Sequence, residues 1–376
     1  MEVNRFIEPL LLEKIQPGKV LVLLGARRVG KTALLNRIVE QLKEPVVFLN
    51  GDDIQTHNLL DIRSTENYLR LMGGSKLLVI DEAQEITDIG KKLKLIADTI
   101  PGLRIIISGS SAFQINNQVA EPLVGRMRTV QLYPLAQLEF SATESLVETT
   151  AKLEERLILG GYPELIHLKT QKEKNDYLKE LAGAYLLKDV FAYEGIKKRD
   201  KIIALLQKIA FRCGTEISLE SLGRELQLSK NTVEKYLDLF TKVFIIYPVS
   251  GFSRNLDNEI TKMKKWYFMD NGIRNALINN FNPLNARDDT GLLWENYLNA
   301  ERIKKTAYQE MERTGFFWRT HAQQEIDRIE TYQDNIDAFE YKWGAGSISA
   351  PSAFKKAYPN ARFQLVNKDN YLNYIT

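Results

Sequence analysis

The sequence predicts an α/β protein whose N-terminal part is a mostly parallel β-sheet covered by helices on both faces. From residue 1 to about residue 140, short apolar runs alternate with segments of helical spacing, a rhythm typical of βαβ units. We expect strands at 19–24, 45–50, 76–81, 103–108 and 128–133. Because ligands bind at the carboxyl ends of such strands, polar residues at those ends are the first candidates for a site.

The first of these runs leads into a phosphate-binding loop. Residues 25–32 read Gly-Ala-Arg-Arg-Val-Gly-Lys-Thr, a complete G-x-x-x-x-G-K-T pattern between a strand and a helix. Its glycines let backbone N–H groups turn inward around a phosphate, and the helix N-terminus adds partial positive charge. Lys31 can reach the β- and γ-phosphates, and the Thr32 hydroxyl can ligate Mg²⁺. The residues that we expect to bind nucleotide here are Gly25, Arg28, Gly30, Lys31, Thr32 and Ala33.

The third run ends in two carboxylates, Asp81 and Glu82. An aspartate at a strand end can hold Mg²⁺ through its waters, and the adjacent glutamate can orient and deprotonate an attacking water. A solvated acidic turn would explain the same residues if they stood alone, but the phosphate loop upstream favours the catalytic interpretation. The sequence therefore predicts ATP and Mg²⁺ as ligands, with Thr32 and Asp81 at the metal, and hydrolysis of the nucleotide.

Two further candidates have alternatives that the sequence leaves open. Ser108, at the end of the fourth run, could sense the γ-phosphate or position the water, or it could be ordinary turn chemistry. Arg126 and Arg128 flank the start of the fifth run. Either could be an arginine finger for a neighbouring subunit, or a plain surface charge. Since a finger acts in trans, this role goes with a homo-oligomer.

Composition excludes several classes of protein. The 376 residues are 44% hydrophobic and 26% charged, as in an ordinary soluble protein of roughly two to four domains. The single cysteine, Cys213, excludes an internal disulfide and a cysteine zinc site. No apolar run approaches the ~20 residues that span a bilayer, and no signal-peptide pattern is present. We therefore expect a cytoplasmic protein without a membrane partner, whose net charge of +3 permits nucleic-acid binding without arguing for it.

The pattern changes after a P-loop core that we assign to residues 1–145. Residues 146–211 are helical in spacing, with a turn at Gly160-Gly-Tyr-Pro163. This segment could be a helical lid that closes over the nucleotide, or a simple linker bundle.

Residues 212–275 read as a winged helix. A serine-capped helix at 219–226 is followed by a second capped helix from Lys230, then by strand runs at 243–249 and 264–269. In a DNA-binding version the second helix enters the major groove of duplex DNA. A purely structural role stays open, because the exposed face of that helix is mixed in charge.

The last segment, 276–376, carries a second possible site. Its strand-like runs place Glu340 and Lys342 on one face, because strand side chains alternate, and Asp327 can join them if the strands pair. Glu295, on a preceding helix, could add a further acid. Two carboxylates suit a divalent cation, and a nearby lysine could help to activate water. Alternating charges on a solvated strand would give the same pattern.

Together these features resemble the bacterial and archaeal AAA-type ATPases that carry a C-terminal domain of unknown function, in which a winged helix is combined with a restriction-endonuclease-like core. The resemblance covers nearly the whole chain. Besides the nucleotide motifs it rests on Gly161-Tyr-Pro-Glu164, Phe268-Met-Asp270-Asn-Gly272, Gly291-Leu-Leu-Trp-Glu295-Asn296, Trp318-Arg319, Glu325-Ile-Asp327 and Glu340-Tyr-Lys342-Trp.

The resemblance implies a P-loop core with an additional strand, in which Asp81 and Glu82 take the metal and base roles. It also implies that Glu295, Asp327, Glu340 and Lys342 sit where a PD-(D/E)xK nuclease keeps its site. The leading hypothesis is a Mg²⁺-dependent AAA+ ATPase that acts as a DNA-associated, nucleotide-driven switch. The alternatives are an ATP-gated, metal-dependent DNA nuclease and a nucleotide-dependent protein-interaction scaffold whose nuclease-like fold is inactive.

Overall fold

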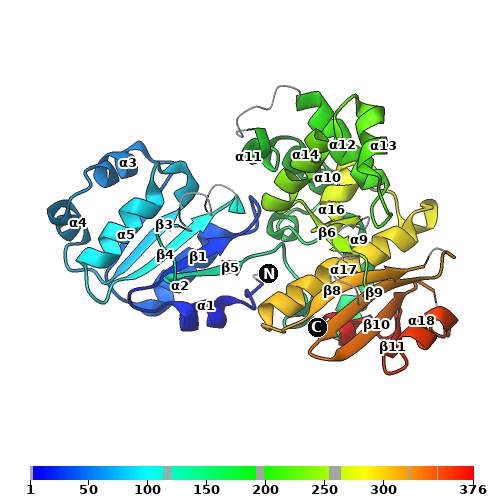
Figure 1. The fold of residues 1–376 in the computed structure, drawn as a ribbon. Helices are drawn as coiled ribbons and strands as arrows, with labels where there is room; N and C mark the ends of the chain where they lie inside the picture. The colour runs from blue at the N-terminus through cyan, green and yellow to red at the C-terminus, as the bar shows by residue number, and fades with distance from the viewer. Residues whose placement is uncertain are drawn as a thin grey trace. The chain divides into compact units, whose positions relative to one another are not determined.

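The chain divides into two compact units (Figure 1). The computed structural model describes residues 3–112, 115, 119, 121–191, 199–253, 264–320, 322–344 and 346–376. The first unit runs to Tyr133 and includes Lys242–Phe244, and the second comprises Pro134–Thr241 and Ile245–Thr376.

The first unit is built on a five-stranded sheet in the order β2-β3-β4-β1-β5, and every neighbouring pair of strands is parallel. All five strands that the sequence predicts are present, and the α/β fold class is confirmed. The bounds are β1 (Val20–Leu24), β2 (Val46–Asn50), β3 (Leu77–Asp81), β4 (Arg104–Gly109) and β5 (Met127–Gln131). Because β4 lies between β1 and β3, the loop after β1 and the acidic end of β3 flank the end of β4.

Helices cover both faces of this sheet (Figure 1). One face carries α1 (Glu8–Lys14) and α2 (Lys31–Leu42). The other carries α3 (Ile54–Asp61), α4 (Thr65–Met72) and α5 (Ile89–Thr99). Apolar residues of these last three helices pack against β1, β3 and β4 in one hydrophobic core. Each β-strand of that core is buried on both sides, which explains its continuous apolar sequence.

The second unit begins with short helices. They are α7 (Gln137–Ser141), α8 (Leu146–Ala151), α9 (Leu153–Leu159), α10 (Gln171–Glu180) and α11 (Lys188–Phe191). The expected turn follows α9, where Gly160 has a φ of +74°. A side chain at Gly160 would overlap the Asp270 carboxylate, which caps α16 (Asn271–Leu277) and accepts a hydrogen bond from the Gly161 N–H at 2.7 Å. The turn therefore needs glycine for its backbone angle and for its close approach to Asp270.

Three helices and a hairpin follow in the order expected of a winged helix. The helices are α12 (Arg199–Phe211), α13 (Leu219–Leu226) and α14 (Lys230–Lys242). The hairpin pairs β6 (Ile246–Ser250) with β7 (Lys264–Phe268) in antiparallel register. Most of the predicted loop between these strands, residues 254–263, lies outside the described residues. The predicted caps form, since the Ser218 and Ser229 hydroxyls accept backbone N–H groups of the first helical turns.

The C-terminal sheet has four strands in the order β11-β10-β9-β8. They are β8 (Thr314–Arg319), β9 (Glu325–Tyr332), β10 (Asn335–Tyr341) and β11 (Arg362–Val366). Only β10 and β11 pair in parallel. The long helix α17 (Thr290–Tyr308) precedes this sheet, and the short helices α18 (Ser352–Ala357) and α19 (Tyr371–Ile375) flank β11 in the chain.

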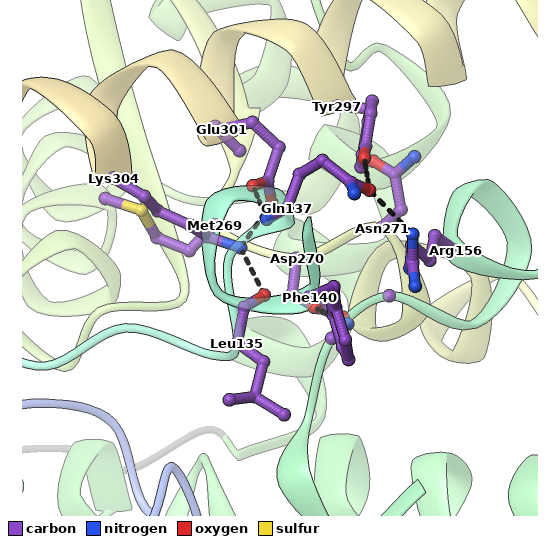
Figure 2. A pocket seen from close by; sticks show the side chains of 13 residues that line it. Leu135, Gln137, Phe140, Arg156, Met269, Asp270, Asn271, Tyr297, Glu301 and Lys304 are labelled. Atoms are coloured by element: carbon purple, nitrogen blue, oxygen red, sulfur yellow. Dashed lines mark hydrogen bonds and ion pairs between the residues drawn. The ribbon is translucent and has the colours of Figure 1, made fainter. Parts of the chain in front are cut away.

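A buried polar network ties the start of the second unit to α17 (Figure 2). Glu301 accepts the Gln137 N–H at 2.5 Å, and Lys304 donates to the Leu135 carbonyl at 3.3 Å. The Gln137 side-chain oxygen accepts from Arg156 at 2.8 Å and from Tyr297 at 2.9 Å. The cavity among these residues holds only about 10 Å³, room for one water at most. This network is therefore a structural joint rather than a substrate pocket.

We expect Asp289 to act as the charge partner of two buried arginines. Arg287 donates two hydrogen bonds to its carboxylate, at 2.7 and 2.9 Å, and Arg274 donates a third. Burial raises the pKa of Asp289, but these donors outweigh burial and lower the pKa to about 2. Asp289→Asn should therefore reduce the free energy of unfolding at pH 7 by about 3 kcal/mol, because it leaves buried cations unpaired.

The contribution of Asp289 to the free energy of unfolding should depend on pH. A carboxyl whose pKa is depressed by folding stabilises the protein above its unfolded pKa of roughly 4, and this contribution disappears as the pH falls through the folded value. Urea unfolding at a series of pH values should show the gap between wild type and Asp289→Asn narrowing below pH ~4. A gap that stays constant down to pH ~3 would contradict the assignment.

Candidate functional site

The phosphate loop connects the end of β1 to the start of α2. A side chain at Gly25 would place its Cβ 2.3 Å from the Leu132 carbonyl oxygen, so only glycine fits there. Gly30 caps α2 with a φ of +94°, and Arg28 has a φ of +64°. Arg28 and Ala33 both lie exposed at the loop and the first turn of α2. The backbone thus takes the curled course that directs N–H groups toward an anion.

Lys31 is the buried cation of this loop, with 5% of its surface exposed. Its ammonium group donates to the carbonyls of Gly25 at 3.1 Å and Ala26 at 3.2 Å. It also lies 3.7 Å from the Glu82 carboxylate. A phosphate can replace carbonyl acceptors of this kind, because charged acceptors bind an ammonium group more strongly than carbonyls do.

Thr32, Asp81 and Ser108 meet at the carboxyl ends of the strands, as their sequence positions predict. The Thr32 hydroxyl donates to Asp81 Oδ2 at 2.5 Å, and the Ser108 hydroxyl donates to Asp81 Oδ1. The Glu82 N–H donates to Ser108 Oγ at 3.1 Å. Hydroxyl and carboxylate oxygens on adjacent elements are the donor set that Mg²⁺ prefers beside a phosphate. The residues present therefore fit that ion.

Glu82 is oriented by Gln84, a residue to which the sequence motifs assign no role. Glu82 has a φ of +49°, which turns the chain sharply after β3. Gln84 donates to Glu82 Oε2 at 2.5 Å and to Ser110 Oγ at 3.3 Å. The buried Gln84 Oε1 has no hydrogen-bond partner within the described part of the chain. Gln84 can thus fix the direction of the carboxylate expected to act as the base.

Arg5 is a second residue that sequence reasoning missed. Its guanidinium is 8% exposed and donates to the Val29 carbonyl at 3.1 Å and to the Tyr133 carbonyl at 2.6 Å. It thereby links the phosphate loop to the end of the segment that follows β5. No local pattern marks this arginine, because its partners lie 24 and 128 residues away in the sequence.

We expect Arg5→Ala to weaken ATP binding by about tenfold or more, because the loop loses a buried hydrogen bond from a charged donor. Calorimetric titration with ATP and Mg²⁺ would measure the loss. Arg70→Ala, which removes an exposed arginine of α4, is the matched control and should bind like the wild type. Equal affinity in Arg5→Ala would contradict a role in holding the loop.

Arg126 lies at the opposite end of the sheet from the phosphate loop. Its carbonyl accepts the Val20 N–H at the start of β1, whereas Gly25 follows the end of that strand. Five residues of strand at about 3.3 Å each separate the two ends by roughly 15 Å. The Arg126 side chain is half exposed and pairs with Asp98. It cannot reach the phosphates of its own chain, so its finger role remains a prediction for a neighbouring subunit.

The second predicted site also comes together in space. Asp327 lies on β9 and Glu340 on β10, and Lys342 follows β10. Lys342 pairs with Glu340 at 2.8 Å, and Asp327 accepts the Tyr341 N–H at 2.7 Å. Burial and the negative charges of Glu295 and Glu340 raise the pKa of Asp327 well above its ordinary value. Glu295, Asp327 and Glu340 therefore lie near one another and form an acidic cluster.

Lys265, on β7, enters the same cluster, which no sequence pattern had indicated. Its side chain is 3% exposed, and its ammonium group pairs closely with Glu325 and lies 3.5 Å from Glu295. The Tyr267 hydroxyl donates to Glu295 at 2.5 Å. Burial lowers the pKa of Lys265, but the carboxylates of Glu295 and Glu325 outweigh burial and raise it. Lys265 is therefore charged within this cluster.

A metal ion does not fit this cluster as it stands. In the part of the chain that the structure describes, no group of three or more His, Cys, Asp and Glu side chains is arranged to hold one. Likewise, no described helix is both long and apolar enough to cross a membrane.

The fold and the loop define the first unit as an AAA-type P-loop domain. Residues 17–141 match the family model described as an AAA domain. Residues 150–284 and 290–374 match two domains of unknown function, DUF8612 and DUF4143. The matches thus place an AAA domain at residues 17–141 and domains of unknown function after it, in the order that the resemblance implied. The winged helix and the nuclease-like core remain predictions.

The chain is similar to proteins of archaea and bacteria. An uncharacterized protein of Methanocaldococcus jannaschii is 26% identical over 270 residues, which are 67% of this chain and 60% of that protein. The match thus spans less than two thirds of that relative's length. An uncharacterized protein of Mycobacterium tuberculosis is 24% identical over 337 residues, covering 88% of this chain and 72% of its own.

Solved structures overlap only loosely with this chain. The RuvB Holliday junction branch migration motor of Thermotoga maritima gives a TM-score of 0.33 at 12% identity, over 65% of this chain and 89% of that one. A signal transduction ATPase with numerous domains from Pyrococcus horikoshii gives 0.31 at 14% identity, over 81% and 46%. Overlaps of this size do not bear on function.

Proposed function

We propose that this protein binds ATP with Mg²⁺ and hydrolyses it as a nucleotide-driven switch. The observation that carries the proposal is that four side chains meet at one end of a parallel sheet: Lys31, Thr32, Asp81 and Glu82. The Thr32 hydroxyl lies 2.5 Å from Asp81 Oδ2. A phosphate-binding loop alone would support binding. The oriented glutamate beside it supports hydrolysis, because a carboxylate there can accept the proton of an attacking water.

Each side chain of the site has one part in this reaction. Lys31 leaves its loop carbonyls and binds the β- and γ-phosphates. Thr32 and Asp81 would hold Mg²⁺, which would supply positive charge beside the phosphates. Glu82, held by Gln84, orients the water and takes its proton. The Ser108 hydroxyl bonds to the Asp81 carboxylate and accepts the Glu82 N–H. A contact between Ser108 and the γ-phosphate would therefore change the positions of both residues.

The further parts of the proposal concern the second unit and other subunits. Residues 146–211 serve as the lid, 212–275 as the winged helix and 276–376 as the nuclease-like domain. Arg126 reaches the nucleotide of a neighbouring copy in a homo-oligomer, since it cannot reach its own. Nucleotide state then changes how the second unit engages its partner.

Duplex DNA is the partner that the winged-helix arrangement supports. On α14, Lys230, Asn231, Glu234, Lys235 and Asp238 are exposed, whereas Thr232, which the helical spacing places on the same face, is half-buried. The groove beside this face is lined by the lysines Lys230, Lys235 and Lys264 and by the acids Glu220, Glu234 and Asp238. These charges cancel, so any DNA contact there is weak in its electrostatic part and depends little on salt.

The experiment is ATP turnover by the full chain in Mg²⁺, with and without duplex DNA, repeated in EDTA. We expect turnover that needs Mg²⁺ and rises when duplex is added. If duplex DNA does not change the rate of turnover, DNA is not the partner, and a protein partner is favoured instead. The absence of any turnover, with ATP still bound tightly, would favour the scaffold and contradict hydrolysis.

A metal-dependent nuclease is the second candidate. It is supported by the convergence of Glu295, Asp327, Glu340 and Lys342, the residues at which the resemblance places a nuclease site. The scaffold interpretation is supported by Lys265, which already neutralises part of this cluster. The two candidates differ in whether the cluster accepts a divalent cation.

A further inference from the structure

The acidic cluster of the second unit is joined by two elements that do not belong to its sheet. Glu295 comes from α17, and Lys265 comes from the hairpin strand β7, whereas Glu325 and Asp327 lie on β9. The hairpin touches the sheet directly, because the Phe252 N–H donates to the Phe317 carbonyl at 2.6 Å. Lys265 therefore projects into the cluster from outside the sheet.

Cationic side chains offset part of the negative charge of this cluster. Its acids are Glu295, Glu325, Asp327 and Glu340, and its cations are Lys265, Lys342 and Arg319, of which Arg319 also pairs with Glu216 at 3.4 Å. Lys342 is 49% exposed and Arg319 lies 3.6 Å from Glu325 at the rim. Lys265 is the buried member, at 3% exposure, with its ammonium group also 5.1 Å from the centre of the Phe317 ring.

Burial decides which cation matters most. A carboxylate away from water needs an opposite charge beside it, and an ammonium group that contacts two carboxylates supplies one. A divalent cation would need the same oxygens, free of the lysine, and would repel its charge. Lysine and metal therefore compete for Glu295 and Glu325.

We propose that Lys265 is an internal cation that takes the place of a divalent metal ion in this cluster and closes it to metal binding. Loss of its charge opens the cluster, and Glu295, Glu325 and Asp327 then bind one Mn²⁺ or Mg²⁺. The proposal does not depend on whether the first unit hydrolyses ATP, because all residues of the cluster lie in the second unit.

The test is calorimetric titration of the full chain with Mn²⁺ in the absence of nucleotide. Asp81→Asn is present in every sample, so that metal at the nucleotide site does not contribute. In this background Lys265→Met, which removes the charge but keeps a long apolar side chain, should bind one Mn²⁺ about tenfold or more tightly than the parent does. Adding Asp327→Asn should remove the gained binding.

The matched control is Lys305→Met. Lys305 is a buried lysine of α17 that donates to the backbone carbonyls of Asn373 and Tyr374 rather than to a carboxylate. Its replacement should give no gain in Mn²⁺ binding. A gain in both variants would mean that any lost lysine charge attracts Mn²⁺, which would overturn the proposal.

Two other outcomes would also overturn it. One is a parent protein that binds Mn²⁺ tightly and loses this binding on Asp327→Asn, because the cluster would then accept metal with Lys265 in place. The other is a folded Lys265→Met that gains nothing. If Lys265→Met does not fold in metal-free buffer, the comparison of the parent with its Asp327→Asn variant decides, and equal, weak Mn²⁺ binding by both supports the proposal.

Discussion

Lys31→Ala is expected to reduce ATP turnover by at least about a hundredfold while the fold survives, since removing one preorganised donor to a developing charge typically costs that much. Lys31 is the buried cation of the phosphate loop, and its ammonium group donates hydrogen bonds to the Gly25 and Ala26 carbonyls. Those carbonyls can bind water instead. Steady-state phosphate release and thermal unfolding, measured side by side, check both halves of the expectation.

The control for this experiment is Lys94→Ala, which removes an exposed lysine of α5 in the same unit. It should keep the turnover of the wild type. Unchanged turnover in Lys31→Ala would refute the assignment of the loop as the nucleotide site. A loss of the unfolding transition would instead show that Lys31 is structural, and the comparison of ATP affinity would then be made with Lys31→Arg.

Glu82→Gln is expected to separate binding from hydrolysis. The amide keeps the size of the side chain but cannot accept a proton, and loss of a general base typically costs 10²- to 10⁴-fold. ATP affinity should stay close to that of the wild type, because Lys31, Thr32 and Asp81 are unchanged. The variant should therefore retain uncleaved ATP after desalting, which quantification of the bound nucleotide would reveal.

Glu85→Gln is the matched control three residues further along. The Glu85 side chain is exposed, and its carboxylate lies 3.9 Å from the largely buried Arg27 of the phosphate loop. The Glu85→Gln variant should hydrolyse ATP at the rate of the wild type. If Glu82→Gln also hydrolyses at the normal rate, another group is the base, and the position of Glu82 after β3 is then structural.

Much of the first unit was predictable because its signals are local. Each buried strand is a short apolar run. The conformation of the G-x-x-x-x-G-K-T loop is predictable from its glycines, Gly25 and Gly30. The position of Asp81 at a strand end was equally readable. The pairing of Asp81 with Thr32 then followed from a general property of parallel sheets, whose carboxyl ends share one edge.

In the second unit, sequence alone predicted elements better than partners. The helices and the hairpin were readable from caps and periodicity, as were the strands that carry Asp327 and Glu340. Strand alternation even placed Glu340 with Lys342. The domain boundaries and the roles of these residues stay predictions, because nothing in a pattern of charges tells a site from a solvated face.

The sequence by itself thus determined the nucleotide loop, its acidic neighbour and the order of strands and helices along the chain. The tertiary structure decided which distant residues complete each site. It brought Arg5 to the phosphate loop, put Arg126 at the far end of the sheet from the phosphates and carried Lys265 into the acidic cluster. The physical reason is that secondary structure depends on neighbours within a few residues, whereas these contacts join segments that are tens of residues apart and meet only when the elements pack.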